Sequence, residues 1–227
     1  MPRHVEHYMN RPSGFITPRR VIGAQLLFAI YDSLVLGFSN RFVWKCPTRR
    51  LLAQYDDMAS ANHLEVGVGT GFFLDRCRFR TAPSRLVILD QNAYTLAHAA
   101  FRLRRYSAQA YQRSILEPLK LGDPGFDSVG INYVLHCLPG DIAGKAVVFE
   151  HLARVMNPNA VLFGSTTLYH GVEKNPLARL CLAAYNRLGI FCNLDDSLDG
   201  LKKMLAQYFS ETRVEVIGCS GIFVCRG

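Results

Sequence analysis

The sequence predicts a single α/β domain built on a doubly wound, mostly parallel sheet of seven strands, with an antiparallel last strand and an N-terminal helical lid. Short apolar runs alternate with amphipathic stretches, which is the pattern of strand–helix–strand units. A glycine-rich segment follows the first apolar run, and two β-rich segments end the chain. A length of 227 residues with 49% hydrophobic residues suits one domain with a sizeable core.

The glycine-rich segment is "HLEVGVGTGFF", residues 63–73. Leu64 and Val66 predict a short strand, and the apolar residues after the glycines predict the start of a helix. Gly67, Gly69 and Gly71 lie between them, and glycine permits both positive φ and the close approach of a ligand to the backbone. A strand, a tight turn and a helix in this order indicate a nucleotide-binding site.

The glycine spacing also indicates the kind of ligand. Dinucleotide sites need a third glycine three residues after the second, and Phe72 stands there. Glu65 lies two residues before the first glycine, where a carboxylate would repel a pyrophosphate but could order the loop or bind an ammonium. We therefore expect a nucleoside that carries a positive amino-acid group, in contact with Glu65, Thr70 and the three glycines.

A second buried strand is predicted from "RLVILDQN", where Leu86 to Leu89 are apolar and Asp90 follows. Asp90 lies 90 − 71 = 19 residues after Gly71. An acid at a strand end about 20 residues past a glycine loop is placed to accept hydrogen bonds from both ribose hydroxyls. Asp90 and the adjacent Gln91 are therefore expected cofactor contacts.

Helix and strand patterns alternate along the rest of the chain. Helices are predicted at 92–104, 141–156, 175–188 and 195–208, and strands at 109–113, 127–134 and 160–166. The "NPN" segment at 157–159 is expected to end the second helix, and Asp195, Asp196 or Ser197 to cap the last one. The closing segments "RVEVIG" and "GIFVCR" are expected to pair antiparallel. Ligands bind beyond the carboxyl ends of such strands, which adds Ser114, Ile115, Asn132, Tyr133 and His136.

The chain resembles the class I S-adenosylmethionine-dependent methyltransferases in "HLEVGVGTG", "LVILDQN", "YQRSILEPL", "FDSVGINYVLHCLPG" and "LARVMNPNAVLFGSTTL". The combination of "YVLHCLPG", "LFGSTTL" and "YNRLGIFCNLDDSLDGL" is similar to small stand-alone microbial methyltransferases of secondary metabolism. "YDSLVLGFSNRFVW" is loosely similar to the start of the quinone-biosynthesis C-methyltransferases.

The resemblance implies a Rossmann-like fold and S-adenosyl-L-methionine as the cofactor. It implies transfer of a methyl group to an oxygen, nitrogen or carbon atom of a small, apolar or aromatic molecule. It also implies an acid that binds the adenine amine after the third strand. This chain has Ser114 there, whose hydroxyl can accept one hydrogen bond.

His136 is the candidate catalytic base, because an imidazole titrates near neutral pH and this one follows the fourth strand. A core histidine bonded to the backbone is an equally weighted alternative. Tyr31, Trp44 and Tyr169 are, with His136, candidate walls of an acceptor pocket. Two other functions stay open: use of the cofactor in a non-methylating reaction such as a cyclisation, and a non-catalytic binding subunit.

The expected domain division is a flexible basic arm at 1–20, a helical lid at 21–57 and a cofactor-binding core at 58–227. The stretch 21–38 is apolar, but Gln25, Asp32 and Ser39 recur every seven residues on one helical side. We therefore expect a lid helix that packs on the core with its polar side toward the site, rather than a membrane span. Transient contact with a membrane surface is the alternative.

The net charge of +8 comes from scattered or local basic residues. In "FRLRRY", Phe101, Leu103 and Tyr106 are expected to face inward and the arginines to be solvated. Small-molecule substrates are favoured over nucleic acid, because the paired prolines typical of base-modifying relatives are missing after "NYVLH". Seven cysteines without a C-x-x-C pair suit reduced thiols in the cytoplasm and no metal site. No signal peptide is visible, and the oligomeric state is open.

Overall fold

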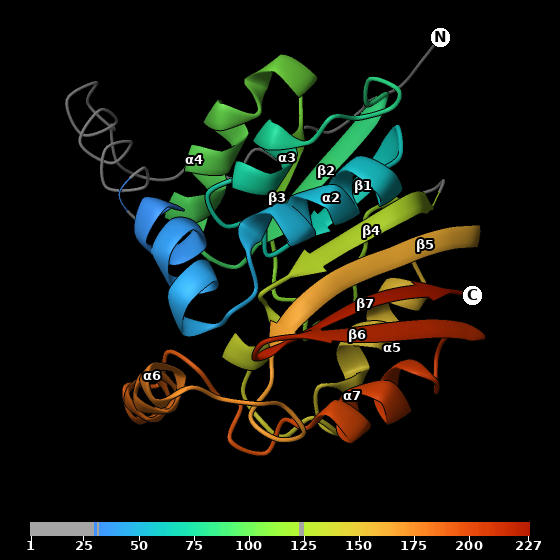
Figure 1. The fold of residues 1–227 in the computed structure, drawn as a ribbon. Helices are drawn as coiled ribbons and strands as arrows, with labels where there is room; N and C mark the ends of the chain where they lie inside the picture. The colour runs from blue at the N-terminus through green and yellow to red at the C-terminus, as the bar shows by residue number, and fades with distance from the viewer. Residues whose placement is uncertain (1–29, 31, 123–124) are drawn as a thin grey trace, which may run out of the picture.

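The computed structural model describes residues 30, 32–122 and 125–227, and its sheet has seven strands with helices on both faces (Figure 1). The strand order is β3-β2-β1-β4-β5-β7-β6. β7 runs antiparallel to both of its neighbours, and every other pair is parallel. The predicted Rossmann-like sheet with an antiparallel last strand is confirmed. The strands are β1 (Asn62–Val66), β2 (Arg85–Asp90), β3 (Gln109–Gln112), β4 (Phe126–Asn132), β5 (Met156–Thr167), β6 (Glu211–Ile217) and β7 (Ser220–Arg226).

The helices form two layers that bury the inner strands of the sheet. On one face, Leu96 and Ala99 of α4 pack in the same cluster as Ile88 of β2. On the other face, Phe149 of α5 and Leu201 of α7 pack in the cluster that contains the inner strands. The helices are η1 (Ser33–Val43, a π-helix), α2 (Thr48–Met58), α3 (Phe72–Arg76), α4 (Ala93–Arg102), α5 (Ala146–Ala153), α6 (Pro176–Arg187) and α7 (Leu198–Leu205), with 3₁₀ turns η2 (Arg104–Tyr106) and η3 (Leu135–Cys137).

Side-chain caps determine where several helices begin. Asn92 Oδ1 accepts hydrogen bonds from the first backbone N–H groups of α4. Asn175 caps α6, whose first residue is Pro176, and Ser197 caps α7. Of the three residues predicted to cap the last helix, the structure therefore selects Ser197, and the helix begins at Leu198 because the cap itself is extended.

Two predicted boundaries were wrong. The helix expected at 141–156 comprises only Ala146–Ala153, because 142–145 form a turn in which the Asp141 carboxylate accepts a hydrogen bond from Gly144 N. The 157–159 segment does not lie between elements. It belongs to β5, which begins at Met156, pairs there with Phe126 and accommodates Asn159 at a left-handed φ of 65°.

The inward face of the α4 region also differs from the prediction. Leu103 is fully buried as expected, but Phe101 is 47% exposed. The side chain of Arg102, expected to be solvated, is only 22% exposed and lies between two carboxylates. Arginine can be buried in this way when its guanidinium group is fully paired.

The lid is described only in part. The proposed arm, Gln25 and Tyr31 lie outside the described residues. The described lid helix η1 continues past Phe38 to Val43, while α2, assigned to the lid by the expected division, packs on the sheet through a bond from Gln54 Nε2 to Phe223 O (2.8 Å). Among the described helices, none has the length and hydropathy needed to cross a membrane.

Candidate active site

The glycine loop, residues 67–71, joins β1 to α3 with positive φ at all three glycines. A Cβ added at Gly67 would lie 2.3 Å from Val134 Cγ2, and one at Gly71 would lie 3.4 Å from Ala99. At Gly69, the same atom would meet only Gly67 O, at 3.9 Å. Packing against Val134 therefore requires glycine at position 67, and at Gly71 the left-handed φ of 75° favours it, whereas Gly69 leaves an open side that a ligand could occupy.

Asp90 ends β2 directly beside this loop. One carboxylate oxygen accepts a hydrogen bond from Gly69 N (3.2 Å) and the other from Asn92 N (2.9 Å). Burial raises the pKa of the Asp90 carboxyl, and the two backbone donors partly oppose that shift. Each oxygen keeps a lone pair for a further donor. Gln91, the next residue, is exposed.

The residues after β3 have different surroundings. Ser114 Oγ accepts a hydrogen bond from Leu116 N (3.3 Å), so its hydroxyl still has one hydrogen and one lone pair to offer. Ile115 is 4% exposed and belongs to the core, and its carbonyl oxygen lies 2.9 Å from His151 Nδ1. Of these two residues, only Ser114 has a side chain that can form a further hydrogen bond, for example to a cofactor.

Glu65 lies in a buried polar network behind the loop. Tyr55 OH donates to one of its carboxylate oxygens (2.5 Å), and His63 Nε2 lies 3.1 Å from the other. Asn132 Nδ2 donates to Tyr55 OH (3.1 Å), while Ser165 Oγ donates to Asn132 Oδ1 (2.7 Å). Burial, with the Glu65 charge, raises the pKa of Tyr55 well above its usual range and keeps the phenol a donor. This arrangement favours the loop-ordering role for Glu65 over direct contact with an ammonium.

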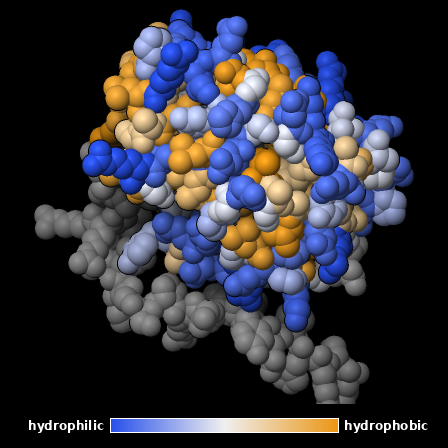
Figure 2. Space-filling view, turned by 90° about the horizontal axis from the view of Figure 1, so that it is seen from below, coloured by the Kyte–Doolittle hydropathy of each residue, from blue (hydrophilic) through white to orange (hydrophobic). Residues whose placement is uncertain are grey.

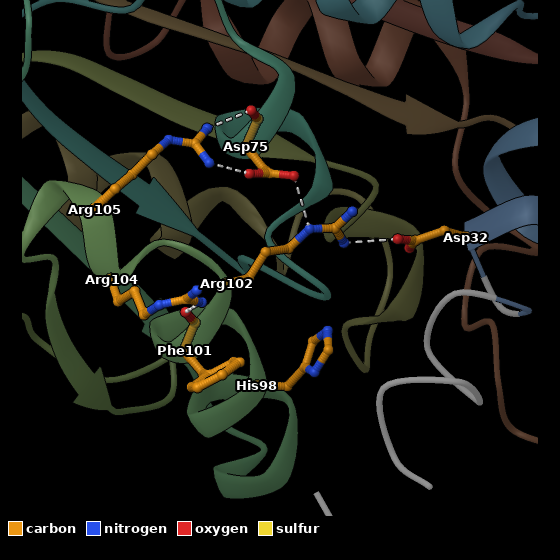
Figure 3. Close-up of a pocket in the computed structure, with 7 residues that line it drawn as sticks. All are labelled: Asp32, Asp75, His98, Phe101, Arg102, Arg104 and Arg105. Atoms are coloured by element: carbon orange, nitrogen blue, oxygen red, sulfur yellow. Dashed lines mark hydrogen bonds and ion pairs between the residues drawn. The ribbon is translucent and has the colours of Figure 1, made fainter. Parts of the chain in front are cut away.

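A second network joins the lid to the glycine loop. Asp32 accepts hydrogen bonds from Thr70 Oγ1 (2.5 Å) and from Arg102 Nη1 (2.7 Å). Arg102 Nε also donates to Asp75 (3.1 Å), which Arg105 binds from its other side (Figure 3). Sequence reasoning placed Asp32 on the inward side of the lid but missed the roles of Arg102 and Asp75, because nothing in "FRLRRY" distinguishes a paired arginine from a solvated one.

Aromatic side chains gather beside the C-terminal ends of β4 and β5. We define the aromatic cluster as Trp44, His136, Tyr185 and Phe191. The ring of Phe191 lies 4.3 Å from that of His136, 5.8 Å from Trp44 and 5.1 Å from Tyr185, between centroids. Of these four residues, the sequence prediction named Trp44 and His136. Tyr185 and Phe191 were missed, although both lie in the quoted stretch "YNRLGIF".

Two further predicted residues border this cluster. Tyr169 packs against the same apolar group as Trp44. Tyr133 has φ 57° and donates its backbone N–H to Ser165 O (2.8 Å), and its ring lies 5.7 Å from that of His136. The structure therefore brings together every predicted acceptor-pocket residue that it describes.

Comparison with known proteins identifies the family. The family model described as a methyltransferase domain matches residues 64–162. The demethylluteothin O-methyltransferase of Streptomyces thioluteus is 39% identical over 194 residues, covering 86% of this chain and 84% of that protein. The chain belongs to the class I S-adenosylmethionine-dependent methyltransferases.

Other matches agree with this family. The physcion biosynthesis cluster O-methyltransferase of Aspergillus chevalieri is 35% identical to this chain over 202 residues, which cover 87% of this chain and 90% of that protein. The fold is similar to that of the N-methyltransferase NodS of Bradyrhizobium japonicum WM9 in complex with S-adenosyl-l-homocysteine, with a TM-score of 0.56 and 16% identity over 79% of this chain and 87% of that one. The cofactor of the present chain is S-adenosylmethionine.

The residues of the methyltransferase fit this cofactor at the carboxyl edge of the sheet. The open side of Gly69 would admit the nucleoside, and the lone pairs of Asp90 would accept its ribose hydroxyls. The Ser114 hydroxyl would meet the adenine amine. When bound, the cofactor supplies a methyl group on a sulfonium, which is already electrophilic. Each of these contacts stays a prediction.

His136 is buried and neutral in the methyltransferase. Burial, together with the charge of Lys145, lowers its pKa to about 3. Thr167 N donates to His136 Nδ1 (3.2 Å), so the ring proton lies on Nε2. A base needs a free lone pair, and the lone pair of Nδ1 already accepts this bond. The geometry matches the alternative of a core histidine bonded to the backbone, while the base role stays a prediction for kinetics to test.

A buried ion pair fixes the segment beyond β5. Lys145 Nζ lies 2.9 and 2.8 Å from the two carboxylate oxygens of Asp196 and donates to Cys192 O (2.7 Å), and both charged side chains are fully buried. Asp196 O accepts hydrogen bonds from Tyr169 N and His170 N. Through these bonds the pair holds Tyr169 in place.

Proposed function

We propose that this methyltransferase acts on a small, apolar or aromatic molecule of secondary metabolism, at an oxygen, nitrogen or carbon atom. The observation that carries the proposal is the aromatic cluster beside the ends of β4 and β5. Ring faces lining a largely apolar site suit a planar or apolar acceptor. The O-methyltransferase names of the two relatives, one of them assigned to a biosynthetic cluster, support this substrate class.

Methyl transfer asks three things of the chain: alignment of the acceptor with the methyl group, exclusion of water, and removal of a proton where the acceptor atom carries one. The buried rings of Trp44 and Phe191 supply apolar walls that exclude water. His136 Nε2 carries the ring proton and has no partner among the described residues, which leaves this N–H available for a hydrogen bond to an acceptor oxygen. An acceptor that is already ionised would need no base.

The test is an acceptor-dependent methylation assay with small phenols, aromatic amines and aromatic acids. Acceptor-dependent release of S-adenosylhomocysteine, with a product heavier by one methylene unit, would support the proposal. Gly69→Val serves as the inactive control. If folded protein binds the cofactor but only rearranged, unmethylated products form, the cyclisation alternative replaces the proposal.

We also propose that the methyltransferase works in the cytoplasm and does not bind nucleic acid. The seven cysteines, all within the described residues, are free thiols, which suits a reducing compartment. A filter-binding assay with RNA and DNA at physiological salt tests the second statement, and salt-sensitive retention at micromolar protein would contradict it.

A further inference from the structure

The lid helix η1 presents an apolar face to solvent. Side chains spaced four residues apart are about half exposed: Leu34 (57%), Phe38 (51%) and Phe42 (47%) on η1, and Ile30 (47%) just before it. On its inward side, Asn40 is buried and bonded to Thr48, and Asp32, the residue just before η1, is buried and bonded to Thr70. Leu36 and Val43 are also buried, so η1 has apolar side chains on both sides, whereas a surface helix of a globular protein normally has a polar outer face. The polar contacts therefore hold η1 with its apolar side outward.

Helix α6 extends this apolar face. Its capping residue Asn175 donates Nδ2–H bonds to Phe42 O (3.5 Å) and Val43 O (2.9 Å), which places the start of α6 beside the end of η1. Leu177 and Leu180 on α6 are 41% and 67% exposed. In Figure 2, which shows the lower face of Figure 1 where α6 and α7 lie, hydrophobic side chains form patches between hydrophilic ones. Exposed apolar groups gathered in this way mark an interaction surface.

The charges on both helices are only positive. η1 carries Arg41, and α6 carries Arg179 and Arg187, and neither helix contains an aspartate or glutamate. The Arg41 guanidinium lies 5.5 Å from the centroid of the Phe42 ring. Asp32 is neutralised by Arg102. Residues 1–29, which precede η1 in the sequence, contain four arginines and one glutamate.

We propose that the outward faces of η1 and α6 dock on an anionic membrane surface. An apolar helix face bordered by arginine is the pattern of helices that lie in the plane of a membrane interface. Anionic headgroups would attract the basic residues while the leucine and phenylalanine side chains enter the acyl boundary. A second copy of the chain fits less well, because a symmetric contact would bring the same arginines together. This inference goes beyond methyl transfer and does not depend on the acceptor.

The experiment is co-sedimentation of the full chain with phosphatidylcholine vesicles, with and without phosphatidylglycerol. We expect binding to the anionic vesicles that weakens as salt rises. The double variant Leu34→Ser/Phe38→Ser should lower the partition coefficient about tenfold or more, because two large side chains no longer leave water. Phe101→Ser is the matched control, since Phe101 is 47% exposed on α4, and it should leave binding unchanged. Melting temperatures confirm that each variant is folded.

Three outcomes would overturn the proposal. The first is that the folded protein binds neither kind of vesicle. The second is that Leu34→Ser/Phe38→Ser binds as the wild type does, or that Phe101→Ser loses as much. The third is that light scattering finds a dimer that Leu34→Ser/Phe38→Ser converts to monomer, which would assign this face to contact between two copies.

Discussion

The glycine loop and the aromatic cluster lie at the same edge of the sheet but are built differently. The loop and Asp90 lie within 24 residues of sequence, and Gly69 N bonds directly to the Asp90 carboxylate. The cluster joins Trp44, His136 and Phe191, which come from three distant segments. The loop thus depends on local backbone geometry, whereas the cluster depends on long-range polar contacts such as the Lys145–Asp196 pair. Substitutions in one region should therefore damage it while sparing the other.

The largest effect is expected for Gly69→Val. A branched side chain at φ 54° is strained, and it would occupy the open side of the loop. We expect the wild type to bind S-adenosylhomocysteine with a dissociation constant of about 1 μM, or roughly 8 kcal/mol of binding free energy. In Gly69→Val, calorimetry should detect no binding. Gly122→Val is the matched control, because Gly122 also has positive φ and open space but lies far along the chain. Equal affinity in the two variants would contradict this role.

Lys145→Met should damage the other region. It leaves the Asp196 carboxylate buried without its partner, so the free energy of unfolding should fall by about 3–5 kcal/mol in urea titrations. Lys145→Met/Asp196→Leu should recover most of this loss. Arg154→Met, which breaks the exposed pair with Glu150, should cost about 0.5 kcal/mol or less. Cofactor affinity of folded Lys145→Met should stay within about threefold of wild type, and a larger loss would show that the two regions are coupled.

Asp32→Ala tests the link between the lid and the loop. Thr70 Oγ1 and Arg102 would lose their shared acceptor, and cofactor affinity should fall about tenfold, or about 1.4 kcal/mol. Asp57→Ala, which removes only an exposed partner of Arg80, is the control. An unchanged dissociation constant for Asp32→Ala would mean that the lid does not support the loop.

His136→Gln should change the pH dependence of stability. The pKa of His136 is about 3 in the folded protein, below its usual 6.5, so the unfolded chain binds a proton that the folded chain does not. Between these values wild-type stability should fall by about 1.4 kcal/mol per pH unit as pH falls, and the variant should lack this contribution. Urea titrations from pH 7 to mildly acidic pH measure the difference between the two slopes.

The same variant tests the base role. Loss of a general base should lower kcat by roughly 10²–10⁴-fold with saturating acceptor. Because the lone pair of Nδ1 already accepts the Thr167 N–H bond, we expect a much smaller change. A fall in that range, with chemistry rate-limiting, would restore His136 as the base.

The smallest effect is expected for Ser114→Ala. Loss of one neutral hydrogen bond to the adenine amine should weaken cofactor binding by about 1 kcal/mol. Calorimetry with S-adenosylhomocysteine measures this, and an unchanged dissociation constant would remove Ser114 from the cofactor contacts.

The sequence by itself predicted the α/β fold class with its antiparallel last strand, the glycine loop and the position of Asp90, because these depend on hydrophobic period and on spacing within one strand–turn–helix unit. It also placed Asp32 on the inner side of the lid. Tertiary structure decided the rest. The partners of Arg102, the occupied lone pair of His136 and the contact of Phe191 with Trp44 all join segments far apart in sequence. No local pattern encodes such contacts, because they exist only after the sheet has brought its strand ends together.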